Sequence, residues 1–355
     1  MVESGLILAI ESSCDETGIA VVEGGRHIVA NVVASQTPLH APAGGIVPEV
    51  AARAHLRWML PVLDEALAQA GLAARADRSR LEAVAVTYGP GLAGSLLVGI
   101  TLAKTFAWLH GLPLVPVNHH EGHIYAAWLL DPGQAERVEP VFPLVALVVS
   151  GGHTFLVEMT DHLTYRLLGQ TVDDAAGEAF DKVGRLLGLP YPGGPSIMRA
   201  ATEAGPHGRR LPRAWLGDSY DFSFSGLKSA VRRAVTEEAG GTADEGVALS
   251  PGLVAEVADA FQEAVVDVLA TKTLRAAEAC LARSIVLGGG VAANRVLRER
   301  VASGAEASGI PLIVPRPGLC TDNGAMIGAA GFLRARAGER AGWDLDARPS
   351  LRLAA

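Results

Sequence analysis

The chain has 355 residues, of which 49% are hydrophobic and 19% charged, and its formal net charge is −8. A chain this apolar can bury a large core, so disorder over most of it is excluded, and its length favours about two domains. No apolar run reaches the roughly 18 residues that cross a membrane, and Met1 to Ile10 lacks a secretory signal pattern. Three distant cysteines (Cys14, Cys280, Cys320) favour free thiols in a reducing, cytoplasmic setting.

The first part of the chain alternates short apolar runs with amphipathic segments, which is typical of an α/β protein. A Gly-rich turn at 87–95 follows one apolar run and opens a helix, an arrangement that can bring backbone N–H groups close to an anion. In chain order we expect strands at 6–10, at 19–22 and after Gly24-Gly25, a helix at 50–70, a strand at 81–86, a helix ending at His110, and a strand at 112–117.

A histidine cluster follows the last of these strands. Three of the ten histidines in the chain lie at positions 119, 120 and 123. If a helix begins after Asn118, a favourable N-cap residue, His119 and His123 share one helix face with Cβ atoms roughly 6 Å apart. Two imidazoles at that spacing can share a metal ion, although a pair of polar surface histidines is an equally valid interpretation. The zincin pattern is absent, because Ile124 stands where its second histidine would be.

The second half repeats the order of elements seen in the first. After a link at 134–140, we expect a hairpin with strands at 144–149 and 155–159 around a tight turn at 150–154. A long helix at 251–282 and a strand at 284–287 follow, then a Gly-rich turn at 288–294 that opens another helix. A strand at 310–314 and a helix from Thr321-Asp322 complete the half. The last strands of the two halves also look alike, since Leu112-Pro113-Leu114-Val115 matches Ile310-Pro311-Leu312-Ile313.

This repetition predicts an internal duplication with a pseudo-twofold axis between the halves. His119/His123 and Asp322 then occupy equivalent positions, each at the helix start after the last strand of its half. Facing each other across a cleft, they would form a two-histidine, one-carboxylate metal site. The alternative for Asp322 is a helix N-cap without any metal.

Several further motifs lie in the second half. Asp174, Glu178 and Asp181 have the spacing of one helix face, for which a solvated surface is the usual explanation. Residues 222–228 mix aromatic, hydroxyl and basic groups, a composition that can contact nucleic acid. They lie in a region, 199–233, with seven Lys/Arg residues against three acids, which makes it a candidate nucleic-acid-binding face, or simply a solvated loop. The tail beyond Gly338 reads as poorly ordered.

The motifs taken together resemble those of the tRNA N(6)-adenosine threonylcarbamoyltransferase family over roughly residues 5 to 335. The resemblance implies the actin-like, sugar-kinase and Hsp70-type ATPase fold (ASKHA), with two duplicated subdomains around a central cleft. We place these at 1–133 and 134–337, with a flexible tail at 338–355. The matching motifs are Ser150 to Thr154, Asp173 to Lys182, Tyr191 to Pro195, Phe222 to Lys228, Gly288 to Arg295 and Thr321 to Gly324.

The same resemblance implies transfer of a threonylcarbamoyl group from threonylcarbamoyl-adenylate to the adenosine beside the anticodon, in tRNAs that read codons beginning with A. It implies a divalent metal, iron(II) or zinc, held by His119, His123 and Asp322, and two partner proteins, a TsaB-like paralogue and a TsaE-like ATPase. It implies no membrane partner. It also implies ligand contacts from Val148, Val149, Ser150, Gly151, Gly152, Asp181, Gly194 and Asn294. Some relatives carry a ligand-binding acid shortly after Pro195, but residues 196–199 contain none.

Three other functions stay open on the sequence alone. A kinase or ATPase of the same fold usually carries an acid in both hairpin turns, and the second turn here has none between Val145 and Phe155, whereas Asp15 and Glu16 lie in the first. A metallopeptidase could use two histidines and an acid, but no glutamate is placed as in a zincin. A non-catalytic scaffold would have no need of the histidine pair.

Overall fold

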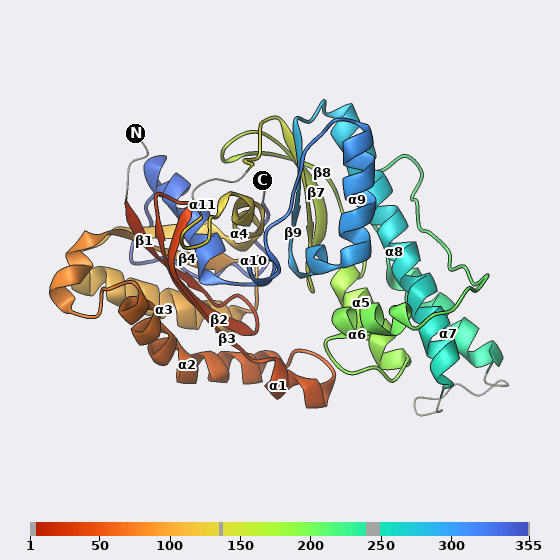
Figure 1. The fold of residues 1–355 in the computed structure, drawn as a ribbon. Helices are drawn as coiled ribbons and strands as arrows, with labels where there is room; N and C mark the ends of the chain where they lie inside the picture. Colours follow the sequence, from red (N-terminus) through yellow and green to blue (C-terminus); the bar gives the residue numbers. More distant parts are fainter. Residues whose placement is uncertain (1–4, 135–137, 239–248, 354–355) are drawn as a thin grey trace.

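The computed structural model describes residues 5–134, 138–238 and 249–353, and it shows two lobes, each built on a five-stranded sheet (Figure 1). In the first sheet the central strand β1 is parallel to β4 and antiparallel to β2. Its residues are buried on both faces, as expected for a nearly continuous apolar run. The sheet has the order β3-β2-β1-β4-β5 and comprises β1 (Leu6–Glu11), β2 (Glu16–Glu23), β3 (His27–Ser35), β4 (Leu81–Gly89) and β5 (Leu114–Asn118).

Helices α2 (Pro48–Gln69) and α3 (Ala93–His110) pack against each other and against this sheet. The turn after α3 is formed by Gly111, whose φ of 65° is left-handed and therefore favours glycine. Two short helices complete the lobe, α1 (Thr37–His40) and α4 (His119–Tyr125). Strand and helix positions thus agree with the sequence, and the helix expected after Asn118 runs from His119 to Tyr125.

The second sheet repeats the first strand for strand. Its order, β10-β9-β6-β7-β8, places β6 at the centre, parallel to β9 and antiparallel to β7, as β1 is to β4 and β2. The predicted duplication and the α/β fold class are therefore confirmed. The strands are β6 (Leu144–Val149), β7 (Thr154–Asp161), β8 (Thr164–Gln170), β9 (Ser284–Gly288) and β10 (Leu312–Ile313), and the helices are α5 (Ala176–Leu186), α6 (Gly193–Thr202), α7 (Ser225–Glu238), α8 (Pro251–Ala279), α9 (Arg295–Ala307) and α10 (Pro317–Cys320).

The last helix, α11 (Gly324–Arg336), belongs to the second half in sequence but packs on the first sheet. Its glycines permit a close approach, since a Cβ on Gly328 would lie 2.6 Å from Val22 and one on Gly331 only 2.4 Å from Ala85. The segment that ends the second half in sequence therefore lies on the first lobe. The chain crosses from the second lobe to the first between α10 and α11, and the metal-ligand candidate Asp322 lies in this crossing segment.

The residues after Gly338, expected to be poorly ordered, lie along the first lobe as far as residue 353. Ala341 donates a backbone hydrogen bond to Leu114 of β5 (2.8 Å), and Arg348 donates one to Tyr88 of β4 (2.7 Å). The polar, arginine-rich composition suggested disorder, but backbone groups of β4 and β5 provide partners that composition does not reveal. No helix in the three described ranges is long and apolar enough to cross a bilayer.

Candidate functional site

A metal-ligand cluster forms where β5 runs into α4. The Asn118 side chain caps α4 by accepting a hydrogen bond from the His120 backbone N–H (2.9 Å). The cap places His119 and His123 on one helix face, with ring centroids 4.7 Å apart. Asp322 Oδ1 lies 3.5 Å from His119 Nε2 and 3.3 Å from His123 Nε2. The structure thus brings together the three residues that the sequence singled out, with ligand atoms within 4.8 Å of one another.

Asp322 does not serve as a helix cap. That role falls to Asn323, whose side chain accepts a hydrogen bond from the Met326 backbone N–H (3.1 Å) at the start of α11. The Asp322 carboxylate is therefore available to face the two histidines. The remaining member of the histidine cluster, His120, packs its ring against His153 (4.2 Å between centroids) and Phe155 (4.7 Å).

The electrostatics of the cluster follow from burial and close opposite charges. Burial opposes a charge on His119, but Asp322 and Glu11 outweigh it and raise the pKa of this imidazole to about 9. Burial likewise opposes ionisation of Asp322, yet the two imidazoles hold the pKa of its carboxyl well below the usual range. On the other side of the cluster, burial and the neighbouring histidines lower the pKa of His153 to about 3.

The donor set fits a divalent transition metal. His123 is fully buried: its Nδ1 has no hydrogen bond within the part of the chain that the structure describes, and its Nε2 has only the Asp322 carboxylate, 3.3 Å away. An unpaired buried imidazole is costly, and a ligand would satisfy it. His119 Nδ1 contacts the Glu11 carboxylate at 3.0 Å, which leaves Nε2 directed at Asp322. Two imidazoles and one carboxylate suit zinc and iron(II) alike.

A second feature of the site is a cavity of about 240 Å³ in the second lobe. Four of the residues implied by the resemblance line it: Gly151, Asp181, Gly194 and Asn294. Gly152 is exposed in the same hairpin turn as Gly151, whereas Val148, Val149 and Ser150 are buried at the end of β6 and do not line the cavity. The other lining residues are Gly177, Phe180, Pro192, Pro195, Met198, Gly290, Val291, Ala293 and Thr321.

The cavity is apolar on its walls and polar at a few points, as small-molecule sites usually are. The Asp181 carboxylate accepts a hydrogen bond from Gly193 N–H (2.7 Å), and burial raises its pKa. Asn294 caps α9 through its oxygen, which accepts from Leu297 N–H (3.1 Å), and its nitrogen donates to the buried Gln262 (2.9 Å). Sequence reasoning missed the wall residues Phe180 and Met198, because nothing local distinguishes them from core positions.

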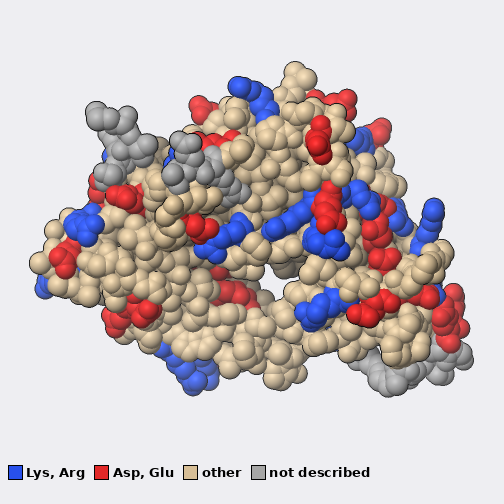
Figure 2. All heavy atoms as spheres, in the orientation of Figure 1, with Lys and Arg blue, Asp and Glu red and all other residues tan. Residues whose placement is uncertain are grey.

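The cavity and the metal-ligand cluster meet at Thr321-Asp322. Thr321 lines the cavity, and the next residue supplies the carboxylate of the cluster. In the space-filling view the surface is hollowed between the lobes, with acidic and basic side chains interspersed around the opening (Figure 2). A ligand in the cavity could therefore extend one end toward His119 and His123.

The predicted acidic stripe is not one helix face. Helix α5 begins at Ala176, so Asp174 precedes it, and only Glu178 and Asp181 are helical. Lys182 neutralises two of the three acids, with its Nζ 2.7 Å from Asp174 and 2.9 Å from Glu178. Asp181 is left to face the cavity.

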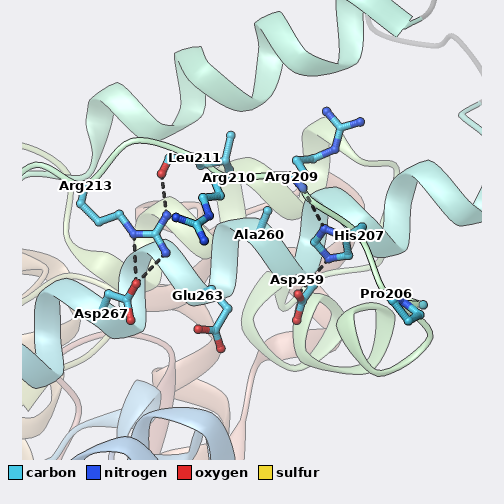
Figure 3. Close-up of a pocket in the computed structure, with 11 residues that line it drawn as sticks. Pro206, His207, Arg209, Arg210, Leu211, Arg213, Asp259, Ala260, Glu263 and Asp267 are labelled. Atoms are coloured by element: carbon cyan, nitrogen blue, oxygen red, sulfur yellow. Dashed lines mark hydrogen bonds and ion pairs between the residues drawn. The ribbon is translucent and has the colours of Figure 1, made fainter.

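The basic region 199–233 divides into a paired and an unpaired part. Within 205–213, His207 lies 3.0 Å from Asp259 and Arg213 lies 2.6 Å from Asp267 (Figure 3). Arg209 pairs with Glu238 and Glu256. Asp259 and Asp267, like Glu256, belong to α8, so this segment is held to that helix by its own charges. Among the residues that the structure describes, five cations of the region have no acidic partner: Arg199, Arg210, Lys228, Arg232 and Arg233.

Comparison with known proteins gives one consistent family. The family described as "TsaD: tRNA N6-adenosine threonylcarbamoyltransferase" matches residues 27–329. A relative of that name from Thermomicrobium roseum is 54% identical, covering 98% of this chain and 97% of its own. Another from Symbiobacterium thermophilum is 51% identical with the same coverage of both chains.

Solved structures support the fold. HypF from T. kodakarensis aligns with a TM-score of 0.58 at 14% identity, covering 94% of this chain and 48% of its own. The activator of 2-hydroxyisocaproyl-CoA dehydratase from Clostridium difficile, solved with bound ADPNP, aligns with a TM-score of 0.50 at 16% identity, covering 94% and 96%. The chain has the ASKHA fold and belongs to the tRNA N6-adenosine threonylcarbamoyltransferase family.

Proposed function

We propose that this chain transfers threonylcarbamoyl from threonylcarbamoyl-adenylate to the N6 amine of the adenosine beside the anticodon, in tRNAs that read codons beginning with A. The observation that carries the proposal is the junction at Thr321-Asp322, where a cavity of about 240 Å³ meets a two-histidine, one-carboxylate cluster. The donor has two ends of different chemistry, and each of these two features suits one of them.

The cavity suits the adenylate end. Phe180, Met198 and Val291 offer apolar walls for a flat base, and the Asp181 carboxylate can accept hydrogen bonds from ribose hydroxyls. Asn294 would lie beside adenine or ribose, since its amide nitrogen has a second hydrogen beyond the one donated to Gln262. Exposed backbone at Gly151, where an added Cβ would meet nothing within 4 Å, leaves room for a phosphate.

The cluster suits the threonylcarbamoyl end. His119, His123 and Asp322 would hold one iron(II) or zinc ion, which when bound supplies a Lewis acid to the carbamoyl carbonyl. The adenine amine is a weak nucleophile because its lone pair is delocalised into the ring, so orientation by the protein matters. In the transfer a bond forms between N6 and the carbamoyl carbon, the carbon–oxygen bond to phosphate breaks, AMP leaves, and N6 loses one proton.

The tRNA would approach over the cations of region 199–233 that lack ion pairs. Lys228, Arg232 and Arg233 lie on α7, and Arg210 lies in the open pocket beside α8 (Figure 3). Such cations can neutralise backbone phosphates without first breaking an ion pair. We further propose that the chain acts in the cytoplasm with a TsaB-like paralogue and a TsaE-like ATPase.

The test is a transfer assay with purified protein, both partner proteins, threonylcarbamoyl-adenylate and unmodified tRNA, with and without chelator. Mass spectrometry of the tRNA nucleosides should show threonylcarbamoyladenosine, and the chelator should remove it. ATP turnover or peptide cleavage by this chain alone, without modified nucleoside, would replace the proposal with a kinase-type or peptidase function.

A further inference from the structure

The carboxylate of Glu11 is buried beneath the metal-ligand cluster. Glu11 ends strand β1 and has no exposed surface. Three donors converge on it: the Ser13 backbone N–H at 2.5 Å from Oε1, the Thr87 hydroxyl at 2.7 Å from Oε2, and His119 Nδ1 at 3.0 Å from Oε2. These contacts connect residues as far as 108 positions apart in sequence, so the three-dimensional arrangement alone reveals them.

An ionised carboxylate can only accept hydrogen bonds, so the nitrogen that faces it must carry the hydrogen. The contact with Glu11 therefore places the hydrogen of His119 on Nδ1. Ser13 Oγ, 3.1 Å from the same nitrogen, is compatible with this assignment because a hydroxyl can also accept. The lone pair of a neutral His119 imidazole is then on Nε2, the atom 3.5 Å from Asp322.

We propose that Glu11 is a positioning residue, whose carboxylate fixes the tautomer and ring orientation of His119 so that Nε2 points to a divalent metal shared with His123 and Asp322. The proposal rests on the metal site proposed above. A carboxylate behind a metal-bound histidine orients the ring and makes it a better ligand, and its loss typically costs 10–100-fold in metal affinity.

The burial of Glu11 argues against a direct role in catalysis. Its three donors occupy the carboxylate within the protein, and its full burial leaves no route for the adenine amine to reach it. Glu11 therefore acts through His119. Thr87 in turn holds Glu11, because its hydroxyl shares Oε2 with the imidazole.

Zinc affinity of the full chain, measured by competition with a chromophoric chelator in the absence of tRNA and donor, tests the proposal. The test variant is Glu11→Gln. A glutamine amide has a single accepting oxygen, so either Ser13 N–H or His119 Nδ1–H would face an NH2 group. The matched control is Glu121→Gln, which alters an equally buried carboxylate on α4 that bonds Arg334 and touches no proposed ligand.

We expect zinc binding 10–100-fold weaker for Glu11→Gln and unchanged for Glu121→Gln. In zinc-loaded wild type, ¹⁵N NMR of His119 should show hydrogen on Nδ1 and metal on Nε2. Unchanged affinity in Glu11→Gln, or equal losses in both variants, would overturn the proposal.

If Glu11→Gln does not fold, the zinc affinity of Thr87→Val tests the role of Glu11 instead. It removes one of the three supports of the carboxylate and should weaken zinc binding by roughly two- to tenfold. Unchanged zinc affinity in that variant would overturn the role of Glu11. A wild-type chain that binds no zinc or iron(II) would instead contradict the metal site itself. That outcome differs from one in which wild type and variants bind zinc equally well, which would contradict only the role of Glu11.

Discussion

The two lobes share one strand order but differ in what stands at the ends of equivalent strands. After β5 the first lobe places His119 and His123, and after β10 the second lobe places Asp322. The central hairpin turn of the first lobe contains the acid Asp15 and is flanked by Glu11 and Glu16, whereas the turn of the second lobe exposes Gly151 and has no acid. The duplicated fold thus brings the two histidines of the first lobe and Asp322 of the second together, and the cavity lies in the second lobe.

The largest effect should come from breaking the contact between the lobes. Asp322→Ala or His123→Ala removes one of three proposed metal ligands, and we expect transfer to fall by at least about 10³-fold with circular dichroism unchanged. His120→Ala is the matched control, because it alters a buried histidine of the same helix whose ring faces His153 and Phe155. A metal-free Asp322→Ala protein with wild-type transfer activity would contradict the metal role.

The charge balance between the lobes predicts a pH dependence. Despite burial, Asp322 and Glu11 raise the pKa of His119 to about 9, so the metal-free protein holds a proton there below that pH. A metal must displace this proton, so apparent zinc affinity should rise with pH, about tenfold per unit, and level off above about 9. Isothermal titration calorimetry in buffers of different ionisation enthalpy would measure the released proton. Equal affinity at pH 6.5 and 8.5 would contradict this picture.

The cavity belongs to the second lobe alone and can be altered without touching the cluster. An added Cβ at Gly194 meets nothing within 4 Å, so Gly194→Val would extend into open space at the cavity. We expect the KM for the donor to rise at least about tenfold while zinc affinity stays the same. Gly205→Val, also in open space but outside this cavity, should leave the KM unchanged. An unaffected KM in Gly194→Val would place the adenylate elsewhere.

The smallest effect concerns the outer surface of the second lobe. Arg232→Glu with Arg233→Glu should weaken tRNA binding and reduce the slope of log affinity against log salt by about 1 per lost phosphate contact. Arg209→Glu places a like charge beside Glu238 and Glu256, so it should lower the melting temperature while tRNA affinity stays close to wild type. If Arg209→Glu lost as much tRNA affinity as the Arg232→Glu/Arg233→Glu protein, ion pairing would not distinguish cations that bind tRNA from cations that do not.

The sequence predicted those features that depend on neighbouring residues or on the repeated order of strands and helices. Asn118 and the four-residue spacing of His119 and His123 define a capped helix face, and the repeated strand order predicts Asp322 opposite them. Because sheet topology follows from the order of elements, the fold class was also predictable. The acidic stripe through Asp174 failed because Ala176 begins the helix two residues later than the spacing required.

Long-range contacts could not be read in advance. Nothing near Glu11 in sequence indicates that it meets His119, and the acids of α8 that pair with Arg209 and Arg213 lie more than 40 residues away. The position of α11 on the first sheet depends on close contacts that its glycines Gly328 and Gly331 make with Val22 and Ala85. Such features depend on tertiary packing, which overrides local composition.

The most direct test of the joint site is a single-turnover transfer measured against metal occupancy. Chelator-stripped protein would be reloaded with increasing iron(II) or zinc, and the amount of threonylcarbamoyladenosine formed in the first turnover would be quantified. We predict a product amplitude that rises in proportion to bound metal and saturates at one ion per chain, with no rise for Asp322→Ala. A full amplitude in the stripped protein would contradict the claim that the two lobes act together through a shared metal.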